Sequence, residues 1–186
     1  MHRVIVGDAA WVDVRPAWLG GIDGLFERLL NTVPWQAELR RLYEPIVDVR
    51  RLLRFYGKGR PLPDPVLAEA RDVLNAYYEA DLGEPLCTAE LCLYRDGRDY
   101  IPWPGDLMGQ DGREDTMVAI VSLGTPRTWL LRPRHGSLAI GHDLGHGDLF
   151  VIGGACQRTW EHAIPMTGRA TGPHISVQFR AARVRR

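Results

Sequence analysis

Several residue types are scarce in this sequence of 186 residues. Lysine occurs once, at Lys58, so arginine carries almost all of the basic charge. Cysteine occurs three times, at Cys87, Cys92 and Cys156. This odd number without paired spacing predicts neither a disulfide framework nor a zinc site of four thiolates. We therefore expect a reducing compartment, the cytoplasm.

The sequence also lacks an excess of either charge and a long apolar run. Its 23 basic and 23 acidic side chains balance at a formal net charge of zero, so no global field attracts nucleic acid. No stretch of about 18 consecutive apolar residues occurs, and no apolar segment follows a basic one at the start of the chain. We expect neither a membrane span nor export.

Arginine is nevertheless concentrated in two places. One cluster consists of Arg40, Arg41, Arg50, Arg51, Arg54, Lys58 and Arg60, and the other of Arg180, Arg183, Arg185 and Arg186. Clusters of this kind either contact phosphate groups or form solvated faces of the surface. A weak, salt-dependent contact with nucleic acid is therefore one hypothesis, and a solvated surface is the other.

The first half of the chain predicts two helices. After Asp23, which can cap a helix, apolar residues recur at helical spacing until Pro34 ends the pattern. The pair Asp64–Pro65 is a stronger start signal, and the apolar positions that follow, through Tyr78, share one face. In the same half we expect a strand over residues 3–6, irregular packing up to residue 20, a strand near 46–49 and a loop at 56–59.

Beyond Gly83 the pattern changes to short β-rich runs bounded by Gly, Pro or Asp. These runs are Ala89–Arg95, Thr116–Leu123, Arg127–Arg132, Ser137–Ile140, Asp148–Ile152, Arg158–Ala163 and Ile175–Arg180. Their spacing, with no helical pattern between them, predicts a sandwich or jelly roll. We therefore expect one domain over residues 1–186, of the α+β class but mainly β. Its helical N-terminal part reaches about residue 84, and its β core spans about 85–182.

Short motifs between Trp35 and Arg180 point to one family. They are Leu93-Tyr94-Arg95-Asp96-Gly97, Trp103-x-Gly105-Asp106, Ala119-Ile120-Val121-Ser122-Leu123-Gly124, His146-Gly147-Asp148, Gly153-Gly154, Trp160-Glu161-His162 and Gln178-Phe179-Arg180. Together they resemble the AlkB family of iron(II)- and 2-oxoglutarate-dependent dioxygenases. The resemblance implies a double-stranded β-helix, or jelly roll, flanked by N-terminal helices, which agrees with the pattern of predicted strands.

The resemblance also implies an iron(II) site made of a His-x-Asp motif and a distant histidine. Asp106 and His162 stand at the second and third ligand positions, but Pro104 occupies the first and has no donor atom. Metal binding is then weak or lost unless another side chain replaces the missing imidazole. Conceivable substitutes, each also readable as an ordinary loop or surface residue, are His142, Asp99 and Glu114.

The positions implied to bind 2-oxoglutarate have changed as well. His174 aligns with the family arginine that pairs with the distal carboxylate, whereas Tyr94 and Arg180 keep the family identities. Cys92 stands in place of a family asparagine. Arginine clamps a carboxylate through a bidentate fork, but histidine offers one charged donor at most, and only when protonated. Binding of 2-oxoglutarate should therefore be weaker and pH-dependent.

Two classes of function follow. In the first, the protein is an AlkB-like oxidoreductase that dealkylates N-alkylated nucleic-acid bases, as in DNA repair, or hydroxylates a small molecule. In the second, the fold is kept while the oxidation is lost or replaced, and the old site binds or converts a different ligand. The side chains available for that role are Asp106, His162, His174 and Arg180. The missing ligand at Pro104 favours the second class.

Overall fold

The computed structural model describes residues 3–7, 9–40, 47–103, 116–168 and 171–182. Its strands form two sheets. The main sheet contains, in chain order, β1 (Arg3–Gly7), β2 (Ala10–Arg15), β3 (Gln36–Arg40), β4 (Val47–Tyr56), β5 (Thr88–Tyr94), β6 (Val118–Gly124), β9 (Leu149–Gly154) and β11 (His174–Arg180). The smaller sheet contains β7 (Arg127–Pro133), β8 (Ile140–Leu144) and β10 (Trp160–Ala163). The helices are α1 (Leu25–Thr32), α2 (Pro65–Tyr77) and the short α3 (Cys156–Thr159).

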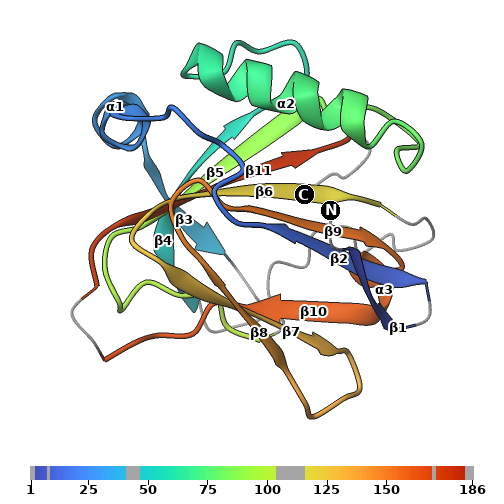
Figure 1. The fold of residues 1–186 in the computed structure, drawn as a ribbon. Helices are drawn as coiled ribbons and strands as arrows, with labels where there is room; N and C mark the ends of the chain where they lie inside the picture. The colour runs from blue at the N-terminus through green and yellow to red at the C-terminus, as the bar shows by residue number, and fades with distance from the viewer. Residues whose placement is uncertain (1–2, 8, 41–46, 104–115, 169–170, 183–186) are drawn as a thin grey trace.

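The main sheet separates two apolar clusters. Strand order across it is β1-β2-β9-β6-β11-β5-β4-β3, and the smaller sheet runs β10-β7-β8. Helices α1 and α2 lie on one side of the main sheet and the smaller sheet lies on the other (Figure 1). One cluster packs Leu67 and Leu74 of α2 against Leu91 and Val177, and the other fills the space between the sheets. This arrangement confirms the predicted double-stranded β-helix.

The N-terminal part is more than the helical extension that the sequence predicted. Strands β1 to β4 all belong to the main sheet, and β2 pairs with β9 from Ala10↔Gly154 to Arg15↔Leu149. We predicted irregular packing here from the Trp and Pro residues of the segment, and the run from Ala10 to Asp13 shows no alternation of apolar and polar residues. The structure explains this pattern, since all four residues are buried, on both faces of the sheet.

Smaller differences concern the ends of elements. Helix α1 has Gly24 rather than Asp23 at its N-cap and no side-chain cap, whereas Asp64 caps α2 as predicted by accepting from the Val66 amide. The strand expected at 137–140 lies at Ile140–Leu144, and α3 occupies the first part of the run predicted as a strand over 158–163. Residue 46 lies outside the described residues, and β4 begins at Val47. Among the helices described, none is long and apolar enough to cross a membrane.

The β1–β2 hairpin is attached to the residues that follow α2 by polar and aromatic contacts. The hydroxyl of Tyr78 donates to Oδ2 of Asp13 over 2.8 Å, and Asp13 is fully buried. Arg3 forms two hydrogen bonds with Asp81, of 2.9 and 2.7 Å, and its guanidinium lies 3.8 Å from the Trp11 ring centre. The Tyr78–Asp13 bond is the buried part of this attachment, so its loss should weaken the domain.

We predict that Tyr78→Phe lowers the free energy of unfolding by roughly 1–3 kcal/mol, because it leaves a buried carboxylate without its donor. Tyr77→Phe is a matched control, since half of that side chain is exposed and its contact with Arg15 uses the ring alone. Urea unfolding should show at most about 0.5 kcal/mol for the control. Equal losses in the two variants would contradict the role of the buried bond.

Candidate functional site

Alternate residues of β11 are polar and face the smaller sheet, and we call them the polar stripe. The strand pairs with β5 on one side and β6 on the other, with His174 opposite Tyr94 and Ser176 opposite Cys92. Directly paired residues point to the same face of a sheet, and Tyr94 and Cys92 belong to the cluster between the sheets. The alternate residues of β11 therefore face this interior. These are His174, Ser176, Gln178 and Arg180, all buried.

The guanidinium of Arg180 is held inside the stripe. Its Nη1 lies 3.2 Å from Oε2 of Glu90, a buried carboxylate on β5, and its Nη2 donates to Oε1 of Gln178. Gln178 in turn donates to Ser176 over 3.2 Å. The positive charge of Arg180 is thus balanced by Glu90 within the protein itself.

His174 occupies the end of the stripe near the turn between β6 and β7. Its Nδ1 lies 3.0 Å from the carbonyl oxygen of Thr125. A carbonyl oxygen only accepts, so Nδ1 carries the proton and Nε2 presents a lone pair. Gly124 forms this turn with φ +88°, and a Cβ there would lie 2.6 Å from the Phe26 ring and the Pro173 oxygen. A glycine is therefore required to aim the Thr125 carbonyl at the histidine.

His174 is neutral at physiological pH. Complete burial lowers its pKa to about 4, and the nearby Arg127 cation acts in the same direction, against the hydrogen bond to Thr125. The ordinary value is 6.5. Between these two values the unfolded chain binds more protons than the folded one, so this histidine lowers stability as the pH falls from about 6.5 towards about 4.

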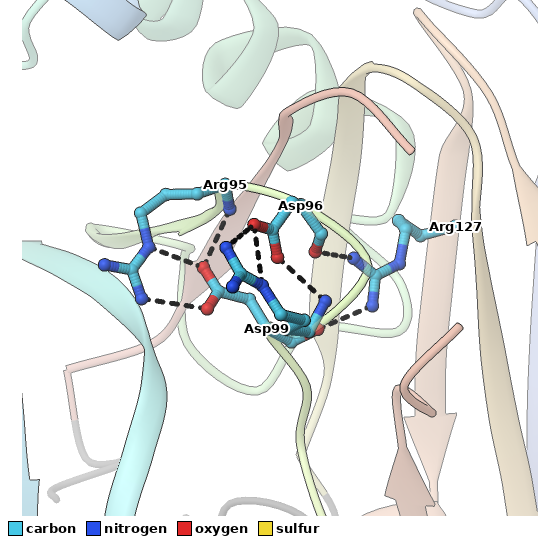
Figure 2. Close-up of polar contacts among 5 residues, drawn as sticks. Arg95, Asp96, Asp99 and Arg127 are labelled. Carbon is cyan, nitrogen blue, oxygen red and sulfur yellow. Dashed lines mark hydrogen bonds and ion pairs between the residues drawn. The ribbon is translucent and has the colours of Figure 1, made fainter. Parts of the chain in front are cut away.

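Arg127, at the start of β7, fixes two loops beside Tyr94 and His174. It is buried, and its guanidinium donates to the carbonyl oxygens of Asp96 (2.9 Å), Asp99 (2.7 Å) and Pro165 (3.1 Å). The first two bonds are drawn in Figure 2. The same cation lies 5.4 Å from the centre of the Tyr94 ring, which is 5.7 Å from the imidazole of His174. Arg127 therefore joins the loop after β5 to the loop after β10.

Asp99 is a structural residue of this loop rather than a substitute metal ligand. Its carboxylate accepts from the backbone amide and the side chain of Arg95 at 2.8–2.9 Å, as Figure 2 shows. Asp96 is paired with Arg98 in the same way, which lowers the pKa of Asp96 to about 2. Both carboxylates are thus occupied with the arginines of their own turn.

The smaller sheet, which faces the polar stripe, carries His162, Trp129 and His142. His162 on β10 stacks on Trp129 of β7 with ring centres 5.4 Å apart, and His142 of β8 stands directly opposite Trp129 in the ladder. His142 also lies 5.0 Å from the Phe150 ring, and burial lowers its pKa. His162 and His142 therefore lie on either side of one buried indole.

The other predicted metal residues cannot be placed in the same way. Asp106, Pro104 and Glu114 lie outside the described residues. The chain leading to them is fixed, because Ile101 pairs with Ile164, two residues beyond His162, through hydrogen bonds of 2.9 and 3.1 Å. In the part of the chain that is described, no group of three or more His, Cys, Asp or Glu side chains could hold a metal ion.

Sequence reasoning missed two charged residues of the site, Glu90 and Arg127. Glu90 had a detectable signal, since it is the one charge in the strand Thr88–Tyr94 and stands two positions before Cys92, on the face of the sheet that carries Tyr94. Arg127 begins a strand in the sequence and gave no such signal. His146 lies in the turn before β9, where its Nδ1 accepts from the Gly124 amide over 3.0 Å.

Comparison with known proteins shows the family to which this chain belongs. The family profile of the 2OG-Fe(II) oxygenase superfamily matches residues 54–185, so the chain belongs to that superfamily. Within it the chain is AlkB-like. It is 25% identical over 190 residues to the human alpha-ketoglutarate-dependent dioxygenase alkB homolog 3, a match that covers 91% of this chain. It is also 26% identical over 133 residues to the DNA oxidative demethylase ALKBH2 of Arabidopsis thaliana, covering 59% of this chain and 42% of that protein.

Two further findings limit these comparisons. The match to the human protein covers 63% of that relative, so the chain spans less than two thirds of its length. A prolyl hydroxylase from Trichoplax adhaerens, solved in complex with a peptide fragment of hypoxia inducible factor, superposes with a TM-score of 0.62. The superposition covers 91% of this chain and 83% of that one at 10% sequence identity, so it supports the fold alone.

We predict that Arg127→Met lowers the free energy of unfolding by at least about 2 kcal/mol, because three carbonyl oxygens lose a charged donor. Hydrogen exchange of the amides in residues 95–101 should become faster in this variant. Arg98→Met is the matched control, since the Arg98 side chain is 79% exposed and its solvent-screened ion pair should contribute far less to stability. An equal effect of the two substitutions would show that Arg127 is not the residue joining the loops.

Proposed function

We propose that this AlkB-like protein has lost or strongly reduced the oxidation of its family, and that the space between its two sheets binds a different small molecule. The observation that carries the proposal is the electrical neutrality of the β11 stripe. His174 is neutral, with a lone pair on Nε2, and Arg180 is balanced by Glu90. The resemblance implies that positive charge on these residues holds the dianion 2-oxoglutarate.

The described residues do not fit 2-oxoglutarate in the way the resemblance implies. A carboxylate placed at Nε2 of His174 meets a lone pair instead of a guanidinium fork, and the fork of Arg180 already bonds to Glu90 and Gln178. Recruiting Arg180 for a ligand would disturb its ion pair with the buried Glu90 carboxylate.

The described residues do not fit an iron(II) centre either. Of the implied triad they include only His162, while Asp106 remains a proposed second ligand outside the described residues. Pro104, at the first ligand position, offers no donor atom whatever its placement. Two protein ligands retain a divalent ion only weakly, so we propose little iron(II) in the isolated protein.

On this proposal the polar side chains of the old site serve to bind and orient a ligand. His174 accepts a hydrogen bond at Nε2, Tyr94 forms the wall beside it, and His162 on the facing sheet is available to give or take a proton. Arg180 has a positioning role, because it is paired with Glu90 and holds Gln178 and Ser176 in one hydrogen-bonded row.

A second candidate function is oxidative dealkylation of alkylated nucleic-acid bases. It is favoured by the names of the relatives, one of which is a DNA oxidative demethylase. The arginine-rich segments, apart from the buried Arg51 and Arg180, would then supply weak phosphate contacts. This function requires a third metal ligand in addition to Asp106 and His162.

We predict that the unmodified protein produces almost no succinate from 2-oxoglutarate when supplied with iron(II), and that Pro104→His combined with His174→Arg raises this uncoupled turnover severalfold. The matched control is Pro102→His combined with His135→Arg, which makes the same changes at two exposed positions and should have no effect. A turnover of about 1 per second or more in the unmodified protein, as in working enzymes, would overturn the proposal.

A further inference from the structure

Strand β1 forms an edge of the main sheet. Among the described strands its one neighbour is β2, with which it pairs from Arg3↔Asp13 to Gly7↔Ala10 (Figure 1). The outer side of a sheet edge presents backbone amide and carbonyl groups that lack a strand to bond to. These groups fit another extended chain, so the chemistry of the edge itself determines the shape of a partner, a segment that adds a strand to the sheet.

The side chains of this edge are apolar on both faces of the sheet. Ile5 is 65% exposed and lies on the side of α1 and α2, because it pairs with Trp11 of the cluster beneath the helices. Val4 is 49% exposed and lies on the opposite face, as does Val6, which packs against the cluster between the sheets. Exposed valine and isoleucine at a sheet edge favour pairing with a further strand.

The charge of this edge is already compensated. Sheet edges are commonly protected from other chains by exposed charges, and β8 at an edge of the smaller sheet carries the exposed Asp143. Within residues 3–7 the one charged side chain is Arg3, and its guanidinium donates two hydrogen bonds to Asp81. The register shift within β1 comes after Ile5, so it lies beyond the most exposed part of the edge.

We propose that two copies of this chain pair through β1 in antiparallel orientation, about a two-fold axis at Val4, and so join their main sheets into one. In this register Val4 lies opposite its counterpart, and Ile5 lies beside the aliphatic part of Arg3 in the other copy. Charge favours this orientation. A parallel pair would place the two Arg3 side chains directly opposite each other, whereas the antiparallel pair separates them.

A second copy fits this edge better than an unrelated segment does. A two-fold contact uses the same edge in both chains, so the exposed Val4 and Ile5 of each copy are covered at once. It demands no charged group from the partner, and each Arg3 keeps its bonds to Asp81. The edge is short, with five residues in β1, so the dimer should be reversible and should dissociate on dilution.

Sedimentation velocity of the full chain tests the association, at concentrations from about 1 µM to about 300 µM. The mean mass should rise towards twice that of one chain as the concentration increases. Backbone amides in residues 3–7 should exchange hydrogen more slowly in the concentrated sample, because some of them then bond across the axis. A chain that stays monomeric over the whole range, or a dimer without this protection, would overturn the proposal.

A charge placed on the edge should separate the two copies. Ile5→Lys should raise the Kd of the dimer at least roughly tenfold, because each new ammonium group lies opposite Arg3 of the other copy. Leu138→Lys is the matched control, since Leu138 is 84% exposed between β7 and β8 and gains the same charge. Circular dichroism shows whether both variants are folded. Equal values of Kd for the two variants would contradict a contact through β1.

A cross-link tests the register. Val4→Cys should give a disulfide-linked dimer on mild oxidation, because the two side chains lie opposite each other at the axis, within the span of a disulfide. Val73→Cys is the control, since Val73 is 55% exposed on α2, away from the edge, and should give no such dimer. The unmodified chain, which keeps its own three cysteines, is oxidised alongside. A dimer in solution that Val4→Cys does not link would place the contact elsewhere and refute the proposal.

Discussion

The register of β11 between β5 and β6 is the constraint on which the rest of the structure depends. The strand alternates strictly, with Ile175, Val177 and Phe179 in the cluster beneath the helices, while the residues between them face the smaller sheet. A shift of one residue would exchange the two sets and bury the polar stripe against α1 and α2. Apolar packing under the helices therefore determines where the polar residues of the site lie.

Burying polar residues in the middle of a sheet requires partners for them. Within the stripe these partners are internal, because Glu90 balances Arg180 and Gln178 links Arg180 to Ser176. The buried row is thus neutral and hydrogen-bonded along most of its length. His174 is the exception, since its Nε2 has no partner in the described part of the chain. The account of function rests on this difference between the two ends of β11.

The sequence predicted the class of fold and most strands, because turn residues bound each short run after Gly83 and the AlkB-like motifs lie between Trp35 and Arg180. It did not predict β2, whose buried residues face both sides of the sheet and show no period. Side chains alternate along a strand, so the even spacing of His174 and Arg180 in the sequence is enough to place them on one face. The sequence could not reveal that Glu90 neutralises Arg180, since that contact joins residues 90 positions apart.

The tautomer of the His174 imidazole therefore determines which ligand groups this residue can bind. With the proton on Nδ1, His174 offers a hydrogen-bond acceptor and no charge. The distal carboxylate of 2-oxoglutarate would then meet no cation at this position. With a charged ring, His174 would replace the family arginine in part. The contact with Thr125, set by the glycine turn at Gly124, favours the first state.

The most direct measurement is the ¹⁵N NMR spectrum of the histidine side chains in the folded protein, with His174 assigned by its substitution. The account predicts a neutral ring protonated on Nδ1 from about pH 5 to 8, which becomes charged only near the pKa of about 4. A ring that is protonated on Nε2, or one that is charged at neutral pH, would contradict it.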